Sequence, residues 1–169
     1  MSDRPLPLTR RCCRDKGLLA VTIQTLISQA RATGDWRPVL QAVPYFRFMG
    51  IDLAVTHGRL EARMAFSEHL IGNPTLPALH GGTLGALLEA VAQCELLYRA
   101  ESVVLPKTIT LTIDYLRSGR PVDTFAVAEV IKQGRRVATV QARAFQDDPT
   151  QSAPSLIALA TVHLLVRAD

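Results

Sequence analysis

The chain has 169 residues, of which 48% are hydrophobic and 20% charged, and its net charge is +4. Length and composition are typical of one globular domain, and no apolar run reaches the roughly 18 residues of a membrane-spanning helix. Basic residues are scattered and only 5% of residues are aromatic, which argues against nucleic-acid binding by base stacking. A few arginines are better suited to a small phosphate-bearing ligand. Because the N-terminus lacks the apolar segment of a secretory signal, we expect a cytoplasmic protein.

The three cysteines show neither a disulfide framework nor zinc-ligand spacing. Cys12 and Cys13 are adjacent in the basic segment 1–15, which we interpret as a flexible tail. Cys94 lies in an apolar segment and is expected to be a small core residue. The four histidines also lack ligand spacing. We therefore expect no metal site.

The N-terminal part of the chain predicts helices. Apolar residues recur at helical spacing over 17–33, and Gly34 follows as a stop. A short second helix is expected over 36–43, ended by Pro44. The first helix is amphipathic and must therefore dock on another part of the protein.

Most of the remaining chain alternates between apolar and polar residues, the pattern of half-buried strands. A turn at His57-Gly58 joins the first two strands, and residues 67–79 are expected to form a loop. The predicted strands cover residues 46–56, 59–66, 107–116, 121–132, 135–146 and 155–166. Their short connections imply an antiparallel sheet.

A helix is predicted from Gly81 to about Arg99, and it is apolar almost all round. Such a helix is buried rather than laid on a surface. A strongly curved sheet that wraps around it would cover it. We find no internal repeat and no second domain.

His80-Gly81-Gly82 precedes this helix, and the helix carries the carboxylate Glu89. A helix N-terminus points unpaired N–H groups outward, and glycines let an anion or a polarised carbonyl come close. This is the raw material of an oxyanion hole. Glu89 has apolar neighbours, so the sequence predicts a buried carboxylate, which would either act as a base or be bonded to an arginine or to backbone.

Gly82 and Glu89 are seven residues apart on one helix, hence about 10 Å along its axis. They share a face but cannot both touch one reacting carbon. A single site would need Gly82 from one subunit and Glu89 from another. Two copies related by a two-fold axis would form two such sites, which predicts a homodimer.

Four segments together carry a family resemblance: Leu79-His80-Gly81-Gly82 with Glu89, then Thr112-Ile113-Asp114-Tyr115-Leu116-Arg117, Lys132-Gln133-Gly134-Arg135-Arg136-Val137-Ala138 and Ile157-Ala158-Leu159-Ala160-Thr161. Over about residues 46–167 the chain resembles the hotdog fold, in particular the PaaI-like acyl-CoA thioesterases. The resemblance implies an α+β hotdog fold, in which a curved antiparallel sheet of about six strands wraps around one buried central helix. An extra N-terminal helix precedes it. The implied division is a tail over 1–15, a helical extension over 16–44 and the hotdog domain over 45–169.

The resemblance also implies an activity, the hydrolysis of an acyl-CoA thioester to free acid and CoA. The Gly82 N–H would polarise the thioester carbonyl, and Glu89 would act as general base or as nucleophile. No cofactor is expected, because CoA is part of the substrate. Sites of this family lie at the dimer interface, which agrees with a homodimer, or a dimer of dimers.

Further residues are candidates for the same site. His80 would orient the loop or hydrogen-bond near the acyl group, or else have a structural role in capping or packing. Asn73 resembles a loop asparagine of the family. Gln93 lies four residues after Glu89 and would position water or bond the carboxylate. Thr108 resembles a hydroxyl near the catalytic carboxylate. For the CoA phosphates we expect a group of residues at strand ends and turns: Arg117, Arg120, Lys132, Gly134, Arg135 and Arg136.

Two other readings compete with a thioesterase. The first is a non-catalytic acyl-CoA-binding sensor, which would not need a base. The second is a hydratase, for which a Gly-Gly helix with one carboxylate is less typical. Loop 67–79 and the N-terminal helix are expected to shape the acyl pocket. The sequence leaves the acyl group open, as it does the choice between CoA and acyl-carrier-protein thioesters.

Overall fold

A curved sheet wraps around one long helix in the computed structural model, which describes residues 22–99, 104–147, 150 and 153–166. The predicted tail, with Cys12 and Cys13, lies outside these residues. The helices are α1 (Ile23–Thr33), α2 (Arg37–Gln41), α3 (Pro44–Phe48), the 3-10 turn η1 (Glu68–Leu70) and α4 (Gly81–Arg99). The strands are β1 (Ile51–Thr56), β2 (Arg59–Met64), β3 (Ile71–Asn73), β4 (Ala78–Leu79), β5 (Lys107–Tyr115), β6 (Thr124–Gln133), β7 (Val137–Gln146) and β8 (Ser155–Leu165).

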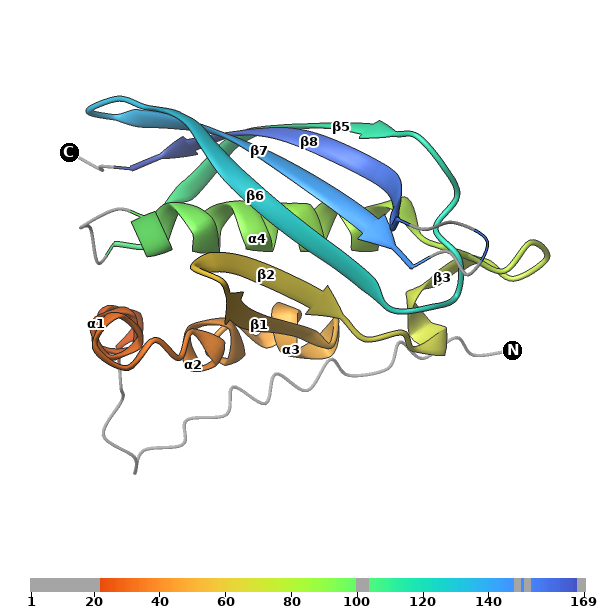
Figure 1. The fold of residues 1–169 in the computed structure, drawn as a ribbon, viewed down its shortest axis with the longest axis horizontal. Coiled ribbons are helices and arrows are strands. Elements are labelled where there is room, and N and C mark those ends of the chain that lie inside the picture. The colour runs from red at the N-terminus through yellow and green to blue at the C-terminus, as the bar shows by residue number, and fades with distance from the viewer. Residues whose placement is uncertain (1–21, 100–103, 148–149, 151–152, 167–169) are drawn as a thin grey trace, which may run out of the picture.

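Six strands form the main sheet in the order β1-β2-β6-β7-β8-β5, and every neighbouring pair is antiparallel. Figure 1 shows α4 enclosed between β1–β2 on one side and the rest of the sheet on the other. The prediction of about six antiparallel strands around one buried helix is therefore confirmed. β5 is an edge strand of this sheet.

The core combines a leucine-rich helix with an alanine-rich inner sheet face. Leu87 and Leu88 of α4 are fully buried. The facing residues on the central strands are small and also fully buried, among them Ala142, Ala144 and Ala158. Small side chains on the sheet let the helix approach closely, and the leucines then fill the space between them.

The N-terminal helices pack at the C-terminal end of α4. Gly34 ends α1 with a φ of 77°, and its N–H donates to Ala30 O at 2.8 Å, as predicted for a glycine stop. Arg31 donates to Leu97 O at 2.9 Å. The Trp36 ring meets Tyr98 edge-on at 5.8 Å between centroids. The N-terminal helix thus docks on the end of α4 far from Gly81.

One predicted strand begins five residues too early. The sequence predicts extended backbone over 46–50, but Pro44–Phe48 form α3, and the strand starts at Ile51. Pro44 does not end a helix as predicted but begins one, because its fixed φ and missing N–H suit the first helical position. Gly50, with a φ of 65°, then turns the chain into β1.

Two connections position the functional region. His57 and Gly58 have φ values of 52° and 73°, so the predicted two-residue turn is confirmed, and it joins β1 to β2. Residues 67–79 are more ordered than the predicted loop, because they contain η1 and the short β3–β4 pair. This pair leads the chain into Gly81 at the start of α4.

Candidate active site

The His80 side chain caps the start of α4. Its Nδ1 accepts the Gly82 N–H at 2.9 Å, so the neutral imidazole carries its proton on Nε2. The same contact changes our expectation for Gly82, because its N–H already has a partner within the chain. Of the two roles considered for His80, the structure shows capping.

Gly81 supplies the available donor instead. Within the described part of the chain, the Gly81 N–H has no hydrogen-bond acceptor, as expected at a helix N-terminus. A surface depression of about 440 Å³ lies beside it and includes Leu84, Tyr115 and Arg117. A carbonyl oxygen placed there would meet a bare N–H and the positive end of the helix dipole.

The sequence pattern assigns no role to Tyr115, although it stands in one of the family-like segments. Its hydroxyl donates to Gly81 O at 2.9 Å. A methyl group on Gly81 would lie 3.2 Å from the Tyr115 ring, so the ring packs directly against this glycine. The period-two alternation of β5 could have shown that Tyr115 shares a face with Ile113, but not that this face meets Gly81.

The β3–β4 segment holds His80 in place from the other side. A Cβ on Gly72 would lie 2.7 Å from His80 Cα, so only glycine fits there without a shift of the backbone. The His80 N–H donates to Leu70 O at 2.8 Å. Asn73, a predicted site residue, caps its own turn, because its Oδ1 accepts the N–H groups of Thr75 and Leu76.

A second group of predicted residues lies further along α4. Gln93 Nε2 donates to Thr108 Oγ1 of β5 at 3.1 Å and approaches Glu89 Oε1 at 3.4 Å. The structure thus brings Glu89, Gln93 and Thr108 together. Gly81 and Glu89 are eight residues apart in α4, hence about 12 Å along its axis. Within one chain, a carbonyl bound at the Gly81 N–H would therefore lie out of reach of Glu89.

The buried carboxylate of α4 is Glu95 and not Glu89. Glu89 is half-buried in the single chain, which corrects the expectation of a fully buried base. Glu95 is 2% exposed, its Oε1 accepts from Arg99 Nε at 2.8 Å, and its Oε2 has no partner among the described residues. The all-round apolar pattern of α4 does not distinguish the two glutamates, because burial depends on which side the sheet covers.

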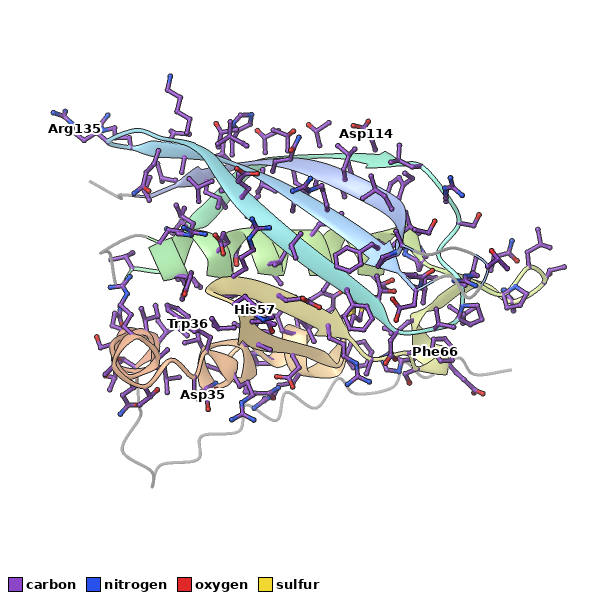
Figure 2. The ribbon with its side chains drawn as sticks, viewed as in Figure 1. Asp35, Trp36, His57, Phe66, Asp114 and Arg135 are labelled. Carbon is purple, nitrogen blue, oxygen red and sulfur yellow. The ribbon has the colours of Figure 1, made fainter. Side chains whose placement is uncertain are left out.

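The basic residues expected to bind phosphate fall into two groups. Arg117 and Arg120 follow the C-terminal end of β5, and Arg120 donates to the Asp147 carbonyl. Lys132, Gly134, Arg135 and Arg136 lie at the β6–β7 turn. β6 separates the groups by about 30 Å, and Figure 2 shows Arg135 at the turn far from Asp114 near the end of β5. One chain does not bring these cations together.

Comparison with known proteins identifies the family. Residues 72–163, more than half of the chain, match the family model of the acyl-CoA thioesterase N-terminal domain. The chain belongs to this family. No curated protein shows significant similarity to it.

Solved structures share the fold of this chain. A Chromobacterium violaceum protein is 34% identical, with a TM-score of 0.65 over 83% of this chain and 96% of that one. A phenylacetic acid degradation-related protein from Ralstonia eutropha JMP134 is 23% identical, with a TM-score of 0.66 over 83% and 99% of the two chains. A Bacillus halodurans protein solved with CoA is 20% identical, with a TM-score of 0.64 over 87% and 92%.

Two further observations concern the described part of this thioesterase-family chain. No three His, Cys, Asp or Glu side chains there gather as a metal site would require. No helix among these residues is long and apolar enough to cross a membrane.

Proposed function

We propose that this protein hydrolyses acyl-CoA thioesters at sites shared between two copies of the chain. Family membership supports thioester hydrolysis in general, and the CoA in the Bacillus halodurans structure suggests the thiol part of the substrate. The observation that carries the proposal is the pair of half-sites on α4. One half offers the Gly81 N–H, which has no acceptor among the described residues, and the other offers the half-buried Glu89 carboxylate.

The edge of the sheet supports the pairing of two copies. β5 is nine residues long, stands at the edge of the sheet and exposes Ile109 and Tyr115. A long edge strand that exposes apolar side chains is a template for pairing with another chain. Two β5 edges pairing antiparallel about a two-fold axis would continue the sheet into a second subunit.

Such pairing would complete both half-sites at once. The Tyr115–Gly81 bond ties the start of α4 to the C-terminal end of β5. The Gln93–Thr108 bond ties the Glu89 region to its N-terminal end. Antiparallel pairing places the C-terminal end of one β5 beside the N-terminal end of the other. Gly81 of one copy would therefore approach Glu89 of the other copy, and the two-fold axis would create two such sites per dimer.

The same symmetry would bring the two groups of basic residues close together. Arg117 and Arg120 of one copy would lie near the β6–β7 turn of the other, because that turn is at the Lys107 end of β5. Arginines bind phosphate with paired hydrogen bonds. The CoA phosphates would therefore be held by residues from both chains.

The reaction needs only these groups. The thioester carbonyl oxygen would accept the Gly81 N–H, which stabilises the negative charge that develops on it. Glu89 would take a proton from water as the water oxygen attacks the carbonyl carbon, and the tetrahedral intermediate would then expel the CoA thiolate. Alternatively, Glu89 would attack the carbon itself and expel the thiolate, and water would hydrolyse the resulting anhydride.

A panel of acyl-CoAs tests the proposal, with the released thiol measured continuously. We expect Glu89→Gln to lower turnover by two orders of magnitude or more while substrate affinity is largely kept. Glu61→Gln, at a half-buried position on β2, is the matched control and should behave as wild type. Binding of acyl-CoA by the wild type without any hydrolysis would instead support a sensor. Unchanged turnover in Glu89→Gln would exclude Glu89 from the chemistry.

A further inference from the structure

The Gly81 N–H belongs to a stretch of backbone that is intrinsically flexible. Gly81 and Gly82 are consecutive glycines, and glycine backbones adopt many more conformations than other residues. An N–H that stabilises a transition state must be held in place before the reaction. The structure shows side chains that restrain the two peptide groups next to Gly81.

The first of these peptide groups carries the Gly81 N–H itself. Its carbonyl, His80 O, accepts from the Thr83 N–H at 2.9 Å and from Thr83 Oγ1 at 2.7 Å. Two hydrogen bonds at one end of a planar group fix the direction of the N–H at its other end. Thr83 is buried, so water competes little for these bonds.

The second peptide group joins Gly81 to Gly82 and is held at both ends. Tyr115 Oη donates to its carbonyl at 2.9 Å, and its N–H donates to His80 Nδ1 at 2.9 Å. The Tyr115 ring also packs so closely against Gly81 that a methyl group added to this glycine would lie 3.2 Å from the ring. Rotation of this peptide would break both hydrogen bonds.

We propose that Tyr115 and His80 are positioning residues that fix the Gly81 backbone, so that the Gly81 N–H meets the thioester oxygen in a preformed orientation. This inference rests on the proposed function and adds to it. Tyr115 acts through its hydroxyl on Gly81 O, and His80 acts through Nδ1 as a cap. Neither side chain needs to exchange a proton with the substrate.

Conservative variants separate the two roles. Tyr115→Phe removes only the hydroxyl and keeps the ring, and we expect kcat to fall about 5- to 10-fold with KM within about twofold. Tyr45→Phe is the matched control, because Tyr45 is equally exposed but lies on α3, and its kinetics should not change. His80→Ala should lower kcat, whereas His80→Asn should restore much of it, because an asparagine oxygen can cap the same N–H.

Amide hydrogen exchange supplies a readout that does not depend on activity. The Gly82 N–H should exchange faster in His80→Ala and in Tyr115→Phe than in wild type, and its slow exchange should return in His80→Asn. Wild-type protein that hydrolyses no acyl-CoA would overturn the proposed function. The exchange rates would still test whether Tyr115 and His80 restrain the Gly81 backbone. Unchanged Gly82 exchange and unchanged kcat in Tyr115→Phe would overturn the role of Tyr115. Failure of His80→Asn to restore either quantity would overturn the capping role of His80.

Discussion

Mixing two inactive variants is expected to restore about a quarter of wild-type activity. The first variant is Glu89→Gln, which lacks the base. The second is Gly81→Pro, which lacks the backbone N–H. Proline suits this position because Gly81 is the first residue of α4, where proline's fixed φ is tolerated.

The magnitude follows from the symmetry. Random association of equal amounts gives mixed dimers as about half of the population. In a mixed dimer, one site combines the intact Gly81 of the first variant with the intact Glu89 of the second. The other site combines the two defects. Half of the dimers with half of their sites intact amounts to about one quarter of wild-type turnover.

Each variant alone needs its own baseline. Loss of one oxyanion donor typically costs about 10²- to 10³-fold in kcat, so Gly81→Pro should be nearly inactive. Gly81→Ala is the matched control, because it adds a Cβ near the Tyr115 ring but keeps the N–H. It should retain far more activity than Gly81→Pro.

The assay is acyl-CoA hydrolysis after the two variants are unfolded together and refolded, with separately refolded variants as reference. Circular dichroism and thermal melting of each refolded sample verify the fold. Activity of the mixture no greater than the mean of the separate variants would refute a site shared between copies. Full activity of Gly81→Pro would refute Gly81 as the donor.

Three further predictions concern stability and reactivity. Arg99→Ala removes the partner of the buried Glu95, and we expect the free energy of unfolding in urea to fall by about 1–3 kcal/mol, with part of the loss recovered when Glu95→Gln is added; an additive double variant would contradict this. The hydrogen bond from the Phe66 N–H, and then the Arg63 side chain, hold the pKa of Asp123 below its usual value. The ionised Asp123 carboxylate therefore stabilises the folded protein above the pKa of the unfolded state, and this stabilisation is lost as the pH falls through the pKa of the folded state. Asp123→Asn should therefore lower stability by roughly 1 kcal/mol at pH 7 and flatten the acid limb of stability against pH, and an unchanged acid limb would count against it. Burial raises the pKa of the Cys94 thiol to about 12, so iodoacetamide at pH 8 should modify it only after unfolding, as peptide mass spectrometry would show; modification of the native protein at the rate of a free thiol would contradict this burial.

Local signals in the sequence were sufficient for most elements. The alternation of apolar and polar residues predicted the strands, and the His57-Gly58 turn has the positive φ values that its residues favour. The length and apolar character of residues 81–99 predicted the central helix. The error at Pro44–Phe48 arose because alternating aromatic residues resemble a strand, whereas the proline at the first position favours a helical turn.

The sequence by itself also determined the chemical groups of the candidate site, because a Gly-Gly helix start and a carboxylate on the same helix are visible without coordinates. Only the tertiary structure decided which partners and surroundings these groups have. The capping bond from His80 leaves Gly81 rather than Gly82 as the available donor, and the Tyr115 contact comes from a strand more than thirty residues away. Packing against the sheet buries Glu95 and leaves Glu89 half-buried. The physical reason is that hydrogen-bond partners and burial depend on which distant segments meet, and residue periodicity reports only the local backbone.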